Sequence, residues 1–163
     1  MAGRHQGGGC EGGVANAVAA RNIPPELIGT WRQLSGRLVD KETGAEGPGL
    51  SQKPNGYFHF DANGRLFNVT TDSARRAPAG AKATDEEAAA LHRSIIAYTG
   101  HYWVEGDKLY FDIDVSWNES WNGTRQLRTV KIDGDTLHVM ADIINPMNGR
   151  PSIHRLTFER EKN

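Results

Sequence analysis

Cysteine, net charge and long apolar runs are all scarce in this chain of 163 residues. Because Cys10 is the single cysteine, neither an internal disulfide nor a thiolate metal cluster can form. The formal net charge of -1 gives no electrostatic attraction to nucleic acid or to anionic lipid. No apolar stretch approaches the roughly 20 residues that a membrane-spanning helix needs. We therefore expect a small cytoplasmic protein that neither binds nucleic acid nor inserts into a membrane.

Motifs of the common enzyme classes are missing as well. The sequence has no glycine-rich dinucleotide fingerprint, no phosphate-binding loop and no nucleophile elbow, which argues against a kinase, a dehydrogenase or a hydrolase. No two histidines have the spacing of metal ligands on one strand. We predict no metal and no cofactor, and a haem held by His154 is a minor alternative.

Glycine is abundant instead, with 19 residues, and three of them stand together at residues 7–9. Glycine loses much conformational entropy when it is ordered, so we predict a disordered leader over residues 1–22. A transit peptide is the alternative, because Arg4 and Arg21 lie among many small residues. Residues 23–163 have an ordinary one-domain length and are expected to form one globular domain.

That domain alternates between short strand patterns and tight turns. Gly29-Thr30-Trp31 opens the first strand, where a tryptophan usually plugs the closed end of a small barrel. Asn63-Gly64 between two alternating segments is a strong hairpin signal. About eight strands follow at short spacing. They predict an all-β fold, an antiparallel up-and-down β-barrel, because closure removes exposed sheet edges.

One helix interrupts the strands. Thr84 is a good N-cap, and the three acidic residues at 85–87 suit the first turn of a helix. The pattern predicts a helix that ends between Tyr98 and Gly100, with Gly100 as the C-terminal cap and a strand from His101.

The order of these segments resembles the bacterial and fungal lipocalin-like domain family. The similarity covers nearly everything from Ile23 onward, and its matching segments are residues 27–32, 56–65, 84–87, 96–100, 104–107, 121–128, 133–137 and 156–160. The resemblance implies a calycin-type, lipocalin-like β-barrel with a small-molecule pocket. It leaves the reaction open, since a fold alone does not define a function.

Strand alternation selects candidates for the barrel interior. If Phe158 faces inward, His154 lies on the same face of the last strand, and Gln126 and Arg128 share the inner face of an earlier strand. A buried Arg128 needs a carboxylate partner or an anionic ligand group. We take His154 as the candidate for proton transfer, and a hydrogen-bonded core histidine is the alternative.

Asp112 and Asp114 have two interpretations. In the first, the apolar residues that alternate with them line the barrel, and both carboxylates are solvated. In the second, the helix packs over that apolar face, and the two carboxylates point into the cavity. There they could neutralise Arg128 and act as general bases.

Aromatic residues are the candidates for ligand contacts. Trp117 and Trp121 bracket a polar loop near one mouth, where they could stack on an aromatic or polyene ligand. Tyr98 could donate a hydrogen bond to a ligand carbonyl. Phe58 and Phe158, together with Gln126, complete the predicted substrate-binding set, although aromatic residues in a small barrel also serve as core plugs.

Two functions of different classes follow. The first is a cofactor-independent cyclase, isomerase or dehydratase acting on a hydrophobic secondary-metabolite intermediate, with His154, Arg128, Asp112 and Asp114 as catalytic candidates. The second is a carrier that holds a similar molecule without changing it. A structural barrel with a filled interior is a third option, and a homodimer is open in each case.

Overall fold

The structure is a computed structural model that describes residues 20–49, 51 and 53–162. Nearly all of the predicted leader therefore lies outside the described residues. The described part has nine strands, one α-helix and two short 3-10 helices. In chain order they are η1 (Pro25–Leu27), β1 (Gly29–Asp40), β2 (Glu46–Pro48), β3 (Pro54–Phe60), β4 (Arg65–Asp72), α1 (Asp85–Arg93), β5 (Ile95–Glu105), β6 (Lys108–Ser116), η2 (Glu119–Trp121), β7 (Arg125–Asp133), β8 (Thr136–Ile144) and β9 (Pro151–Arg160).

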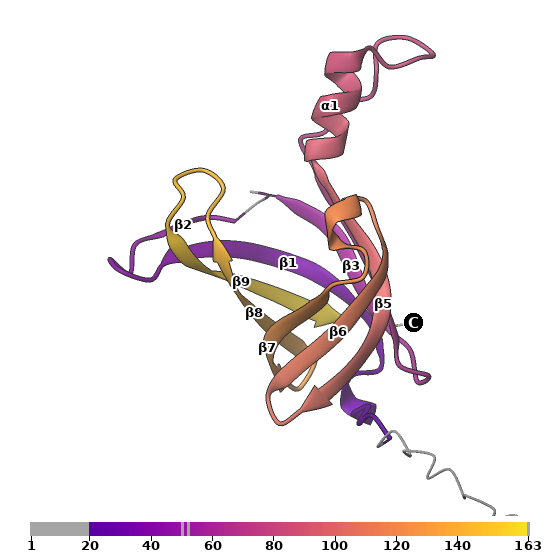
Figure 1. Cartoon of the computed structure of the whole chain (residues 1–163), viewed down its shortest axis with the longest axis vertical. Coiled ribbons are helices and arrows are strands. Elements are labelled where there is room, and N and C mark those ends of the chain that lie inside the picture. The colour runs from indigo at the N-terminus through magenta and orange to yellow at the C-terminus, as the bar shows by residue number, and fades with distance from the viewer. Residues whose placement is uncertain (1–19, 50, 52, 163) are drawn as a thin grey trace, which may run out of the picture.

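The strands form a closed antiparallel barrel. Strands β3 to β9 pair in chain order, β1 pairs with β3, and β9 returns to pair with β1 along residues 31–40. Only the short β2 lies outside this closure, because it pairs with the far end of β1 alone. Figure 1 shows the resulting up-and-down barrel. The predicted fold class is confirmed.

Trp31 closes one end of the barrel, as its position in the sequence predicts. Its side chain is fully buried, and its Nε1 donates a hydrogen bond to the Leu27 carbonyl oxygen at 2.9 Å. The Arg160 guanidinium lies 4.2 Å from the centre of the Trp31 ring and donates to the Ile28 carbonyl oxygen at 2.8 Å. This end also holds fully buried aromatic side chains such as Phe60. The core is therefore concentrated at the closed end.

Helix α1 begins as predicted and ends earlier. Thr84 accepts from the Glu87 N–H, and the Glu87 carboxylate accepts from the Thr84 N–H, which is a complete capping box. The helix ends at Arg93, and Ile95 already belongs to β5. The predicted end between Tyr98 and Gly100 is thus wrong, because the β-branched isoleucines that follow the helix pair with β4 instead.

Gly100 has a role other than the predicted helix cap. It lies inside β5, and a Cβ at this position would come within 2.0 Å of the Asp112 carbonyl oxygen. The register between β5 and β6 shifts at the step from Thr99 to Gly100, so that Asp114 is an extra, bulged residue. Beyond the bulge Val115 is 62% exposed, although strict alternation would place it inside.

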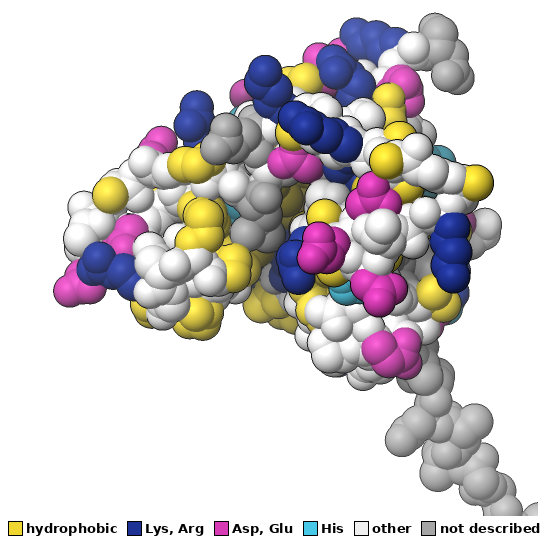
Figure 2. Space-filling model, turned by 90° about the horizontal axis from the view of Figure 1, so that it is seen from above, with side chains coloured by type: hydrophobic (Ala, Val, Ile, Leu, Met, Phe, Trp, Pro, Cys, Tyr) yellow, Lys and Arg dark blue, Asp and Glu magenta, His cyan; other side chains and the backbone are white. Residues whose placement is uncertain are grey.

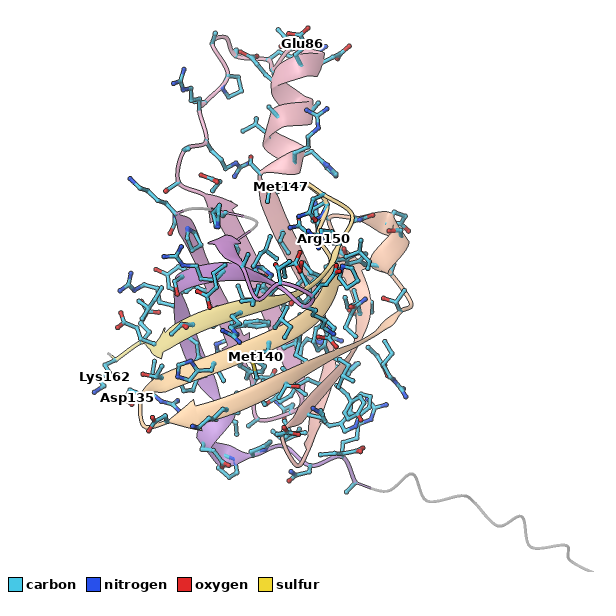
Figure 3. The ribbon with its side chains drawn as sticks, turned by 90° about the vertical axis from the view of Figure 1, so that its left-hand side faces the viewer. Glu86, Asp135, Met140, Met147, Arg150 and Lys162 are labelled. Atoms are coloured by element: carbon cyan, nitrogen blue, oxygen red, sulfur yellow. The ribbon has the colours of Figure 1, made fainter. Side chains whose placement is uncertain are left out.

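Helix α1 extends beyond the open end of the barrel. It stands on the connection between β4 and β5, and none of its residues is buried. In Figure 3 Glu86 lies at the end of α1 farther from the barrel, whereas Met147, in the β8–β9 loop, lies below the helix. No helix in the described part of the chain is long and apolar enough to cross a membrane.

Candidate functional site

The open end of the barrel leads into a cavity of about 1140 Å³. A drug-sized ligand occupies a site of roughly 300–1,000 Å³, so this cavity has room for one such molecule. Figure 2 looks at the molecule from above and shows the hollow, with hydrophobic side chains inside it. The apolar part of the wall includes Phe58, Ile96, Trp117, Trp121, Val139 and Leu156.

Arg128 brings a positive charge into this cavity. It lies on the inner face of β7, as the strand phase predicts, and its guanidinium is 5.3 Å from the centre of the Phe111 ring. Its Nη1 donates to the Leu127 carbonyl oxygen at 2.8 Å and makes a long contact of 3.5 Å with Gln126 Oε1. None of the ion pairs among the described residues includes Arg128. The cation therefore lines the cavity without a carboxylate partner from this part of the chain.

His154 lines the same cavity from β9, also as predicted. Burial, with the charge of Arg128 as the second cause, lowers the pKa of His154 to about 4. The imidazole is therefore neutral at physiological pH. Gly36 leaves room for it, since a Cβ at Gly36 would lie 3.3 Å from His154 Nε2.

Tyr98 lies between the polar and the aromatic parts of the wall. Its ring stacks on Phe111 at 5.5 Å with an angle of 2° between the planes, and it lies 5.7 Å from Trp121. Burial raises the pKa of the Tyr98 hydroxyl to about 12, although the charge of Arg128 acts in the opposite direction. The hydroxyl stays protonated at any physiological pH and can donate a hydrogen bond.

Trp117 and Trp121 lie at the mouth, where their polar loop predicts them. Their rings meet edge to face at 4.8 Å, and the short helix η2 carries Trp121. The backbone N–H of Trp117 donates to the Ala97 carbonyl oxygen at 2.8 Å, which fixes the chain at Trp117 to β5. His92 of α1 is 3.3 Å from the Trp117 carbonyl oxygen, so the helix contacts this side of the mouth.

Three buried polar residues of the wall are missing from the predicted set. Gln33, Asn68 and Thr70 line the cavity, and the Thr70 hydroxyl donates to Gln33 Oε1 at 3.0 Å. Alternation could have found them, because Gln33 is two residues after Trp31, and residues 68 and 70 follow Leu66 in the same phase. The prediction followed this phase only on other strands.

Asp112 and Asp114 do not reach the cavity. Asp112 accepts hydrogen bonds from Arg125 at 2.7 Å and from Arg21 at 3.3 Å, and Asp114 pairs with Arg65 at 2.9 Å. These arginines lower the pKa of both carboxyls on the outer surface of the barrel.

The interpretation that turned the two aspartates inward is therefore corrected. The inner face of β6 is occupied by Leu109, Phe111 and Ile113, which are almost completely buried. The helix, which only this second interpretation placed over the apolar face, stands away from it at the mouth, and the first interpretation, with both carboxylates solvated, agrees with the structure.

Phe58 and Phe158 take different positions. Phe58 lines the cavity, as predicted for a ligand contact. Phe158 is fully buried, with its ring 5.4 Å from that of Phe58, and it does not line the cavity. It belongs to the core below the site. Among the described residues no three His, Cys, Asp or Glu side chains gather closely enough to hold a metal ion.

The fold and the site together define a class of protein, a small barrel plugged at one end by a tryptophan and open at the other to a ligand-sized cavity. The family model described as a lipocalin-like domain matches residues 28–161, and the chain belongs to this family. The resemblance found in the sequence is thereby confirmed.

Two solved structures match this chain at low sequence identity. A lipocalin-like protein from Bacteroides uniformis is 10% identical with a TM-score of 0.46, and the match covers 83% of this chain and 99% of that one. A lipoprotein from Klebsiella pneumoniae is 10% identical with a TM-score of 0.42 and coverages of 88% and 80%. No match was found among curated proteins.

Proposed function

We propose that the barrel binds one hydrophobic small molecule that carries an anionic oxygen group, and that Arg128 holds this group. The observation that carries the proposal is Arg128 itself, a cation on the cavity wall without a carboxylate partner among the described residues. A half-buried cation that no carboxylate neutralises is a favourable partner for an anionic ligand group. A carboxylate or an acidic phenol or enol of the ligand would supply the partner through a charge-assisted hydrogen bond.

The rest of the wall suits the hydrophobic part of such a molecule. Trp117 and Trp121 present aromatic surface near the mouth, and Phe58 and Leu156 present apolar surface deeper in the cavity. Tyr98 and the side-chain amides of Gln33 and Gln126, which also line the cavity, provide a few polar groups that could orient ligand oxygens. A mostly apolar cavity with one cationic anchor is expected to select an amphipathic acid over its neutral analogue.

Catalysis is the second candidate function, and the relation of His154 to Arg128 favours it. The charge of Arg128 contributes to the lowered pKa of His154, so the two groups are close enough to interact. A neutral imidazole could take a proton from the carbon beside a ligand carbonyl, leaving the electron pair on the enolate oxygen, which Arg128 would stabilise. Return of this proton to another carbon completes an isomerisation without a cofactor. In a cyclisation the enolate carbon would instead attack a second carbonyl carbon of the same ligand, whose π electrons move to its oxygen, and the imidazolium would protonate the resulting alkoxide.

The test of binding compares acids with their amides. The protein is incubated with pairs of aromatic and long-chain carboxylic acids and the corresponding primary amides, and retained molecules are identified by native mass spectrometry. We expect the wild type to retain acids in preference to amides by at least about tenfold, which is the effect of one charged hydrogen bond. Arg128→Gln should lose this preference.

The matched control is Arg125→Gln, which removes the same charge from the outer face of the same strand. An equal loss in both variants, or equal retention of acids and amides by the wild type, would contradict an Arg128 anchor. Catalysis is tested with extracts of the source organism. A bound molecule that leaves altered from the wild type and unaltered from His154→Ala supports the isomerase or cyclase, whereas unaltered release from both supports the carrier.

A further inference from the structure

Three arginines line the cavity on the side of α1. Arg75 and Arg76 belong to the loop before the helix, and Arg93 is the last residue of α1. All three line the cavity, and all three are exposed. None of them takes part in an ion pair within the described ranges. Arg75 makes only a long contact of 3.4 Å with the Leu91 carbonyl oxygen.

Three acidic side chains, Asp72, Glu87 and Asp142, line the same side of the cavity, and one of them is neutralised by a lysine. The Asp72 carboxylate accepts from the Ala74 N–H at 2.7 Å, and Glu87 accepts the backbone N–H groups of the capping box and of the preceding loop. Asp142 forms an ion pair with Lys41 at 2.9 Å. Bonds from neutral N–H groups leave the negative charges of Asp72 and Glu87 in place, and neither carboxylate forms an ion pair among the described residues. The three arginines therefore give this side of the rim a local excess of positive charge, on a chain with a net charge of -1.

We propose that Arg75, Arg76 and Arg93 form an anion-attracting entrance, here named the entry cluster. The ligand class is an amphipathic molecule with a carboxylate, sulfonate or phosphate group. Its anionic end meets the entry cluster first and then passes to Arg128 inside the cavity. This inference rests on the proposed function, because it takes Arg128 as the final position of the same anionic group.

The physical basis is the difference between the exposed charges of the entry cluster and the half-buried charge of Arg128. Exposed charges at a cavity mouth raise the rate of encounter with an opposite charge, by about tenfold or more at low salt, and this effect weakens as salt screens it. They add little to the affinity once the ligand has moved inward, since solvent screens them. The entry cluster should therefore act on the association rate constant, and Arg128 should act on the dissociation rate constant.

Two fluorescent probes separate charge from hydrophobicity. One is 1-anilinonaphthalene-8-sulfonate, and the other is N-phenyl-1-naphthylamine, which has the same rings without the sulfonate. Stopped-flow fluorescence gives both rate constants for each probe at low and at high salt. The variants are Arg75→Gln/Arg76→Gln/Arg93→Gln for the entry cluster and Arg128→Gln for the interior.

A control triple variant removes three positive charges elsewhere. In this variant glutamine replaces Lys108, Lys131 and Lys162. These lysines lie on the outer surface or near the closed end, and none of them lines the cavity. This variant changes the net charge as much as the entry-cluster variant does. It therefore reports how much of any effect comes from total charge alone.

We expect the entry-cluster variant to bind the sulfonated probe about threefold to tenfold more slowly at low salt, with an unchanged dissociation rate constant. High salt should remove this difference. Arg128→Gln should raise the dissociation rate constant of the sulfonated probe, and neither variant should affect the uncharged probe. An unchanged association rate constant in the entry-cluster variant, or an equal fall in the control triple variant, overturns the entrance.

The same data separate the two proposals. If the sulfonated probe binds and responds to Arg128→Gln but not to the entry-cluster variant, the entrance is wrong and the proposed function stands. If the wild type binds neither probe, or binds both with rates that Arg128→Gln leaves unchanged, the proposed function fails and the entrance fails with it.

Discussion

At the scale of single residues, the site depends on two polar side chains of the cavity wall, His154 and Arg128. His154 is neutral because the cavity wall removes it from water, and Arg128 has no carboxylate partner among the described residues. The neutral imidazole of His154 and the cationic guanidinium of Arg128 together can bind an acidic ligand, whose negative charge would pair with Arg128.

His154 predicts how stability depends on pH. Its pKa is about 4 in the folded state, against the ordinary histidine value of 6.5. Between these values the unfolded chain binds more protons, so the free energy of unfolding falls as pH falls from 6.5 toward 4. The full effect is on the order of 3 kcal/mol. Urea unfolding at pH 7.5 and 4.5 should show a smaller loss in His154→Gln than in the wild type.

An NMR titration of the imidazole provides the direct check. A His154 pKa near 6.5 in the folded protein would contradict the burial argument. Because burial is the main cause and Arg128 the second, Arg128→Gln should raise the pKa of His154 only in part. A bound anionic ligand should also raise the pKa of His154, since the ligand charge offsets that of Arg128.

At the scale of elements, alternation predicted the strands that carry the site and failed where the strand itself is irregular. Residues 126 and 128 of β7 and residue 154 of β9 face the cavity because both strands keep their period of two along this stretch. On β6 the same rule fails at Val115, because the bulge at Asp114 inserts one residue. A bulge depends on a contact with the neighbouring strand, and the sequence of β6 alone does not contain that information.

The end of α1 was missed for a related reason. A glycine near the end of a helical pattern is a good signal for a C-cap, and Gly100 fitted it. The structure uses Gly100 for close approach of β5 to β6 instead. Local propensity can suggest both roles, and only the pairing of β5 with β4 from Ile95 onward distinguishes them.

Gly100→Ala tests the close approach. The new Cβ would lie 2.0 Å from the Asp112 carbonyl oxygen, which is backbone and cannot move aside without disturbing the pairing of two strands. We expect the free energy of unfolding to fall by about 3 kcal/mol or more, within the range of severe overpacking. Gly47→Ala is the control, since a Cβ there meets nothing within 4 Å. Equal unfolding midpoints in urea for the two variants would contradict this role.

At the scale of the whole molecule, packing and binding are separated along the barrel axis. The closed end contains Trp31, its Arg160 partner and the aromatic core, whereas the open end contains the cavity and the tryptophans of the mouth. The outer surface holds the paired carboxylates of Asp112 and Asp114, which have no part in the proposed site.

This separation predicts that one tryptophan substitution affects mainly stability and another mainly ligand binding. Trp31→Ala should lower the free energy of unfolding by about 3–5 kcal/mol, because it empties the plug and removes a buried hydrogen bond. The folded fraction should still bind the sulfonated probe normally. Trp121→Ala should cost only about 1–2 kcal/mol of stability and should weaken probe binding. Thermal unfolding and probe titration on the same samples measure both effects, and parallel losses in the two variants would contradict the separation.

The placement of α1 has a consequence for how this barrel can change. The segment 73–94 leaves β4 and enters β5 at one point, where the Asp72 N–H donates to the Ser94 carbonyl oxygen at 3.1 Å, and the helix within it buries no residue. The segment that carries the entry cluster is thus an insertion between two paired strands. Its sequence can change without disturbing the hydrogen bonds between the strands of the barrel. Exchange of this segment between related barrels would transfer the preference for an incoming charge without redesign of the core.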